Sequence, residues 1–115
     1  DLVAERPDDV QKIVDPWYAT LAWIEANPDE ATAIMAEQAG VTPADYATYA
    51  KGTKILDAPG ALDAFADSTA PTSLPNTARK INPFLVSSGL TREEADLTGL
   101  FSDGFTKAYI DGGGK

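Results

Sequence analysis

The chain has 115 residues, of which 43% are hydrophobic and 23% charged, values typical of one globular domain or part of one. Eighteen acidic against nine basic residues give a net charge of −9, which argues against binding nucleic acid or an anionic membrane because phosphates would be repelled. The absence of Cys and His excludes disulfides, thiolate or imidazole metal sites and a Ser-His-Asp triad. A carboxylate or Lys could still catalyse a reaction, so an enzyme is disfavoured rather than excluded, and no cofactor is expected.

No apolar run approaches the ~20 residues that span a bilayer, and no signal peptide is visible. The chain opens on Asp1-Leu2-Val3, and we expect it to be part of a longer polypeptide. Residues 1–110 are expected to form one helical segment, and residues 111–115 a flexible tail.

An apolar stripe predicts a helix from about Pro7 to Ala26. Its members recur at steps of three and four residues, with one single step: Val10, Ile13, Val14, Trp17, Leu21 and Ile24. Pro7 suits the first helical position, and Asp8-Asp9 suit the positive end of the helix dipole. Pro16 removes a backbone donor, so either the helix kinks there or Asp15 caps a second segment. The unbroken stripe favours the kink.

Two shorter helices are predicted next, each opened by a cap and a proline. Asn27-Pro28-Asp29-Glu30 is typical of a capping box, and Gly40 is typical of a helix end. Thr42-Pro43 opens a second helix, which Gly52 closes.

The segment Thr53–Asp57 is the best strand candidate, and Leu2-Val3 could be the end of another strand. Residues 57–60 are predicted to form a turn, followed by one or two helical turns at residues 61–65. Because a buried strand needs pairing partners, we expect the missing strands to be encoded before Asp1.

Three more helices are predicted in the last third of the chain. One runs from Ser73-Leu74-Pro75 to about Ser88-Gly89, with a kink at Pro83. A capping box at Thr91–Glu94 predicts a brief helix, and residues 105–109 a final one. The fold class is therefore mainly α, with five or six helices and one or two short strands.

An ordered series of sequence runs resembles the C-terminal third of substrate-binding proteins of ABC importers, of the nitrate/sulfonate/taurine type. The series spans about residues 2–109 and consists of these runs: residues 6–15, Trp17-Tyr18, 21–30, 33–36, 49–55, 72–75, 84–86 and 97–101. The resemblance implies the C-terminal part of one α/β lobe of a periplasmic-binding-protein type II fold. It also implies a periplasmic or extracellular location, with membrane association through the parent protein.

The implied function is delivery of a small anionic or organic solute, such as a sulfonate, taurine or nitrate, to an ABC permease. The implied partners are the rest of the parent binding protein, the permease and the solute, with self-association of the segment also possible. Most ligand contacts would come from earlier in the parent chain, so no ligand-binding residue is assigned here.

Aromatic residues are the first candidate contacts. Trp17, Tyr18 and Trp23 could form a ligand wall, and Tyr46 and Tyr49 lie three apart on a short predicted helix. At helical spacing such residues more often pack in a core or at its rim, which is the favoured interpretation.

Acidic residues are the second set of candidates. Asp8-Asp9, Asp29-Glu30 and Glu93-Glu94 could ligate a metal, but each lies in the first turn of a predicted helix, where capping and the dipole explain it. The spacings at Asp63–Asp67 and Asp103-Gly104 do not match a calcium loop. No metal site and no catalytic residue is predicted.

Three remaining features have an ordinary structural explanation. Thr72-Ser73 and Asn76 could hold an anion at a helix start, but N-capping is favoured. Gly112–Gly114 lacks the spacing of a phosphate loop. Lys51 and Lys54 could face an acidic partner, although solvated charge is the default.

Two further functions compete with the solute-binding hypothesis. The chain could be a stand-alone acidic helical interaction domain that buries its apolar stripes internally or in a partner's groove. A carboxylate-based hydrolase would need two acidic groups about 5–10 Å apart in a cleft, which no spacing predicts.

Overall fold

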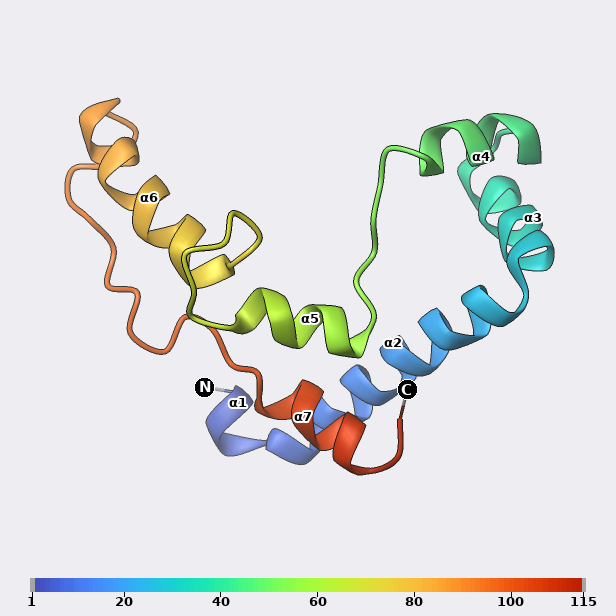
Figure 1. Cartoon of the computed structure of the whole chain (residues 1–115), viewed down its shortest axis with the longest axis horizontal. Coiled ribbons are helices and arrows are strands. Elements are labelled where there is room, and N and C mark those ends of the chain that lie inside the picture. Colours follow the sequence, from blue (N-terminus) through green and yellow to red (C-terminus); the bar gives the residue numbers. More distant parts are fainter. Residues whose placement is uncertain (1, 115) are drawn as a thin grey trace.

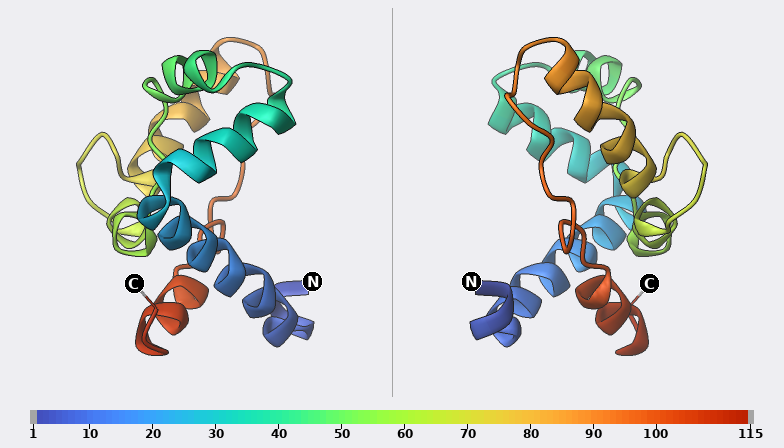
Figure 2. Two further views of the ribbon diagram at one scale, coloured as in Figure 1. Left: turned by 90° about the vertical axis from the view of Figure 1, so that its right-hand side faces the viewer. Right: turned by 90° about the vertical axis from the view of Figure 1, so that its left-hand side faces the viewer.

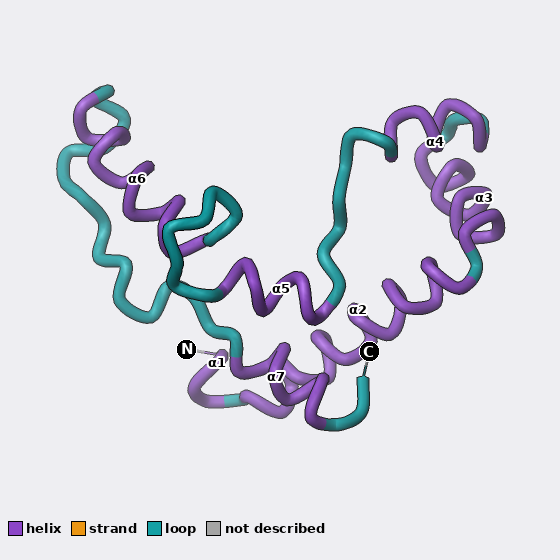
Figure 3. The backbone as a smooth tube through the Cα atoms, viewed as in Figure 1, coloured by secondary structure: helices purple, strands orange, loops and turns teal. Residues whose placement is uncertain are grey.

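The structure, a computed structural model, describes residues 2–114 and is helical with connecting loops (Figure 3). Its seven helices are α1 Leu2–Glu5, α2 Pro7–Ala26, α3 Pro28–Ala39, α4 Pro43–Ala50, α5 Ala58–Phe65, α6 Leu74–Ser87 and α7 Gly104–Asp111. The mainly α prediction is confirmed. The prediction of one or two short strands is wrong, since residues 2–114 contain none.

The helices form two arms on a common base (Figure 1). α2 contacts α7, and α5 contacts both α6 and α7, so these helices make the base. α3 and α4 pack on each other as one arm, and α6 forms the second arm. Figure 2 shows both arms rising away from α7 and from the beginning of α2.

The arrangement is open for a chain of this length. The radius of gyration is 17.6 Å and the extents are 46 × 35 × 26 Å, whereas a compact domain of this length has a radius of about 13 Å. The accessible area is 8407 Å², against about 6,000 Å² for a compact protein of this mass. The helices therefore leave much of their surface uncovered.

Both predicted strands have another conformation. Leu2-Val3 lies in α1, and Thr53–Asp57 is an exposed loop between the α3–α4 arm and α5. The amides of Lys54, Ile55 and Leu56 bond to no acceptor within residues 2–114. Without a neighbouring strand, a sequence with strand character has no ladder to join and stays a loop.

The first long helix tolerates its internal proline. α2 is one helix across Pro16, so a separate segment capped by Asp15 is not formed. The Thr20 hydroxyl donates to the Pro16 carbonyl at 2.7 Å. The continuous apolar stripe therefore predicted the helix correctly.

Asn27 joins α2 to α3 differently from the predicted capping box. Its side-chain amide donates to the Trp23 carbonyl at 2.9 Å, and no side-chain cap bond reaches the first turn of α3. Asn27 therefore closes the end of α2. Gly40 ends α3 as predicted, at a φ of 68° that favours glycine.

Two local predictions around the remaining helices are wrong. The predicted turn at residues 57–60 is the beginning of α5, where the Asp57 carboxylate accepts from the Gly60 amide at 2.9 Å. The segment Thr91–Glu94 is a loop and not a helix. Next to it, Asn82 pairs with the backbone of Ala95 through two hydrogen bonds, which hold this loop along α6.

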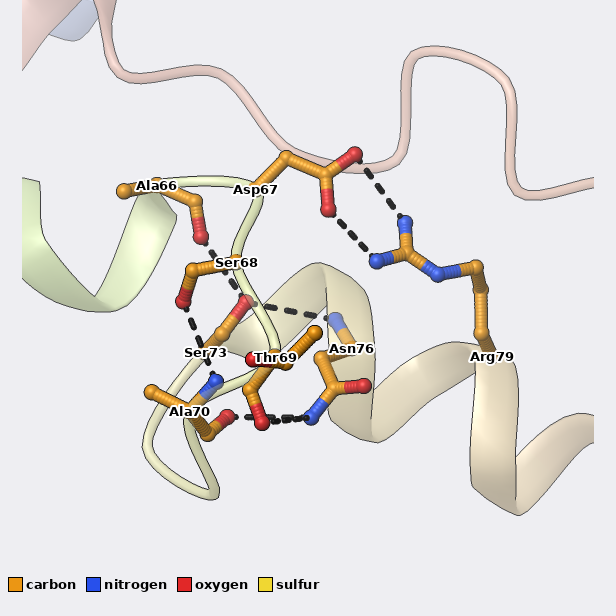
Figure 4. Close-up of polar contacts among 8 residues, drawn as sticks. All are labelled: Ala66, Asp67, Ser68, Thr69, Ala70, Ser73, Asn76 and Arg79. Atoms are coloured by element: carbon orange, nitrogen blue, oxygen red, sulfur yellow. Dashed lines mark hydrogen bonds and ion pairs between the residues drawn. The ribbon is translucent and has the colours of Figure 1, made fainter.

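A polar cluster fixes the beginning of α6 (Figure 4). The fully buried Ser73 hydroxyl donates to the Ala66 carbonyl at 2.8 Å and accepts from the Asn76 amide at 3.3 Å. The Asn76 side chain donates to the carbonyls of Thr69 and Ala70. The loop between α5 and α6 is therefore folded onto the helix that it precedes.

An exposed ion pair adds to this cluster. Arg79 on α6 donates through both terminal nitrogens to the Asp67 carboxylate, at 2.5 and 3.2 Å (Figure 4). The hydrogen bond from Arg79 lowers the pKa of Asp67 below its ordinary value of 3.8. The pair ties the loop to α6 over an interval of twelve residues.

We expect acid to release this pair. Because the folded pKa of Asp67 is lowered, its stabilising contribution is complete above the ordinary value and is lost as pH falls through the folded pKa. A titration of the Asp67 carboxyl carbon by NMR should give a midpoint below 3.8. In Arg79→Gln the midpoint should return toward the ordinary value, and an unchanged midpoint would contradict the assignment.

Candidate functional site

A groove of about 700 Å³ lies between α2, the α3–α4 arm and the loop before α5. We call it the α2–α4 groove. Its walls carry aliphatic and aromatic side chains, among them Leu21, Ile24, Met35 and Ile55. Three tyrosines also line it: Tyr18, Tyr46 and Tyr49. The groove therefore offers mainly apolar contact surface, as small-molecule and peptide sites do.

The three tyrosine hydroxyls have different surroundings. Tyr18 is buried, and its hydroxyl lies 2.8 Å from the Thr106 hydroxyl on α7. The Tyr46 hydroxyl donates to the Met35 sulfur at 3.1 Å, joining α4 to α3. Tyr49 is 66% exposed, and its hydroxyl makes no hydrogen bond within residues 2–114. Of the three, only Tyr49 has a hydroxyl that is free to meet an incoming group.

The aromatic ligand wall that was the less favoured alternative for α2 does not form. Trp17 and Trp23 are 53% and 41% exposed and lie outside the groove lining, whereas Tyr18 lies in it. The ring of Tyr18 packs on the ring of Tyr109, with the ring centroids 5.1 Å apart, so it joins α2 to α7. The interpretation as packing residues holds for Tyr18, while the two tryptophans are uncovered in this chain.

Charges around the groove are few and unpaired. Glu25, Lys54 and Asp57 line it, and none of them forms an ion pair within the part of the chain that the structure describes. The wider charge is uneven, since residues 1–50 hold ten acidic and two basic residues, and residues 51–115 hold eight and seven. Lys51 and Lys54 are therefore basic residues directly beside the acidic half of the chain.

The predicted acidic pairs stay apart. Asp8-Asp9 and Asp29-Glu30 lie in the first turns of α2 and α3 as predicted, and Asp9 contacts both Arg6 and Lys12. Glu93-Glu94 lies in a loop, so a helix dipole does not explain that pair. Among residues 2–114, no three acidic side chains converge on a point that could hold a metal ion.

The segment weighed as a possible anion site is occupied by the protein's own hydrogen bonds. Ser73 caps α6 as the favoured interpretation had it, and both carbonyls that face Asn76 accept from its side chain. Thr72 is exposed. Gly112–Gly114 follows α7, and the three amides bond back to carbonyls of that helix. Neither segment therefore presents a ring of free amides to an anion.

Comparison with protein-family models, with curated proteins and with solved structures finds no match to this chain. The resemblance to solute-binding proteins therefore stays a prediction from sequence. None of the helices within residues 2–114 has the length and apolarity to cross a bilayer.

Sequence reasoning missed the residues that build the groove from separate elements. Leu21 was part of the predicted stripe, but nothing in the sequence placed it opposite Tyr46 or Ile55. The bond between Tyr18 and Thr106 joins residues 88 positions apart and has no local signal. Periodicity identifies one apolar face of a helix and cannot name the partner of that face.

We expect Tyr18→Phe to loosen α7 from α2. The substitution leaves the buried Thr106 hydroxyl without its partner, at a cost of about 1–3 kcal/mol. Amide exchange in residues 104–111 should speed up accordingly, as measured by hydrogen–deuterium exchange. Tyr49→Phe is the matched control, because that hydroxyl makes no bond within residues 2–114. Equal exchange in the two variants would show that the Tyr18–Thr106 bond does not hold α7.

Proposed function

We propose that this chain is the C-terminal helical part of an extracytoplasmic solute-binding protein. That protein would deliver a small anionic or organic solute, of the sulfonate, taurine or nitrate kind, to an ABC importer. The binding would be non-covalent, by closure of a cleft around the solute, and the ligand would shift the balance between open and closed states. The order and spacing of the sequence runs described above support this assignment.

The observation that carries the proposal is the uncovered apolar surface of the helices. Tyr18 is the only large hydrophobic side chain among residues 2–114 that is buried, and the other buried hydrophobic residues are alanines. Ile13, Phe84 and Leu90 are all more than 60% exposed. Monomeric soluble proteins rarely expose so much apolar surface, and such surface is typical of a contact with further structure.

The surface has the form expected of helices that cover a sheet. α2 carries the apolar stripe described above, and α6 carries one at helical spacing, formed by Ala78, Ile81, Leu85 and Val86. Both stripes include exposed residues, such as Trp17 on α2 and Ile81 on α6. In an α/β lobe, such stripes pack against the face of a β-sheet. The role of this chain is then to supply packing and rigidity to one lobe, while other parts of the parent protein hold most of the solute.

The proposal predicts that solute binding needs the parent protein. Calorimetric titration with taurine, nitrate and an alkanesulfonate should give no micromolar binding to the 115-residue chain. The full-length gene product that contains the chain should bind one of these solutes, because its cleft is complete. Micromolar binding by the isolated chain, or no binding of any solute class by the gene product, would contradict the proposal.

The alternative is a stand-alone acidic interaction domain, and one observation favours it. The α3–α4 arm is held together by contacts within the arm. Gly40 ends α3, the Thr42 side chain caps α4, and the Tyr46 hydroxyl donates to the Met35 sulfur.

The two functions differ in the expected thermal melt. An independent domain of this length should unfold in one sharp, cooperative transition. The solute-binding proposal predicts a broad loss of helix signal, because few apolar side chains are buried. Circular dichroism at 222 nm, with size-exclusion chromatography to detect self-association, separates the two. A sharp transition in a monomer would favour the interaction domain.

A further inference from the structure

The segment Thr53–Asp57 combines exposed apolar side chains with backbone amides that have no partner in the described part of the chain. All of its residues are exposed, including Ile55 and Leu56 at 55% and 37%. It crosses from α4 to α5 as a drawn-out stretch of chain (Figure 1), and Asp57 at its end has extended dihedral angles. The backbone amides of Lys54, Ile55 and Leu56 have no acceptor within residues 2–114.

These features restrict what can cover the segment. A partner that buries Ile55 and Leu56 also removes water from the adjoining backbone, and each buried amide or carbonyl left without a partner costs about 1–3 kcal/mol. A helix uses its own backbone groups internally and cannot satisfy a row of them. An extended chain can, because its free amides and carbonyls alternate along one edge.

The charge on the segment restricts the partner further. Lys51 and Lys54 make no ion pair within residues 2–114, and no acidic residue lies between them and Asp57. Residues 51–57 thus carry two basic residues and one acidic residue, Asp57 at the end, in a chain of net charge −9. An acidic residue on the partner would therefore complement Lys54 across the pair.

We propose that Thr53–Asp57 is an acceptor edge for one added β-strand, an extended apolar segment with an acidic flank. The inference rests on the proposed function and deepens it, since the strand would come from the parent protein and its side chains would enter the α2–α4 groove. Tyr49 and Ile24 line that groove and would contact the alternate side chains that point inward.

The test uses the 115-residue chain and a synthetic probe peptide, acetyl-Asp-Glu-Val-Thr-Val-Thr-Val-amide. Amide exchange of residues 53–58 is followed by NMR with and without millimolar peptide. We expect exchange to slow about tenfold or more at alternate residues only, because successive amides of a strand point to opposite edges. Unchanged exchange, or equal slowing at Lys54, Ile55 and Leu56, would overturn the proposal.

Two matched peptides and two chain variants sharpen the result. One peptide carries N-methyl groups on its valines and the other on its threonines, so each blocks one edge, and only one of them should lose binding. Lys54→Glu should lower the affinity for the acidic peptide. A peptide with Lys-Lys in place of Asp-Glu should restore binding to this variant. Lys80→Glu on α6, outside the groove lining, should change neither affinity. Equal loss with both N-methylated peptides would overturn strand addition.

The outcomes separate this inference from the proposed function. Solute binding by the full-length gene product does not depend on whether a free peptide adds to Thr53–Asp57 of the isolated chain. Strand addition without solute binding would leave the acceptor edge standing and remove the transport assignment. Solute binding by the gene product, without slowed amide exchange at alternate residues of Thr53–Asp57, would support the transport assignment and remove the acceptor edge.

Discussion

The whole structure depends on one constraint: the apolar face of each helix has to be buried against another element. An amphipathic helix is stable in a protein when its apolar stripe is buried against another element, and propensity alone contributes little. Here α2 carries a stripe along its whole length, yet only Tyr18 of that helix is buried. The two-armed shape, the large accessible area and the broad melt that we expect all follow from this shortage of cover.

Individual polar bonds maintain the arrangement where few hydrophobic side chains are buried. The Tyr18–Thr106 pair joins α2 to α7, and the Ser73–Asn76 cluster holds the loop against α6. Asn82 does the same for the loop at Ala95. Each of these bonds fixes the position of one element or loop against a neighbouring element in space. None of them brings the two arms together, and none of them closes the α2–α4 groove, which α6 does not line.

The successes and failures of sequence-based prediction divide along the same line. The helix at Pro7–Ala26 was predictable because a stripe and a first-turn proline agree, and this agreement outweighed Pro16. The helix expected at Thr91–Glu94 was not formed, since a capping pattern without a following apolar stripe has nothing to pack. The strand expected at Thr53–Asp57 was wrong within this chain, because a strand is defined by a neighbour. For the site, the sequence identifies Tyr46 and Tyr49 as candidates. It does not predict that they line the same groove as Tyr18 and Ile55.

The sequence by itself determined most of the helical segments and many of their ends, although it did not predict α1 and it predicted a helix at Thr91–Glu94 that is a loop. It also determined which chemistry lacks the residues it needs. These properties depend on side chains a few positions apart, on prolines and glycines, and on composition. Tertiary structure alone decided that Tyr18 faces α7, that the tryptophans lie exposed and that a groove opens beside Thr53–Asp57. The physical reason is that burial is a relation between distant parts of a chain, and an apolar stripe does not specify what it will touch.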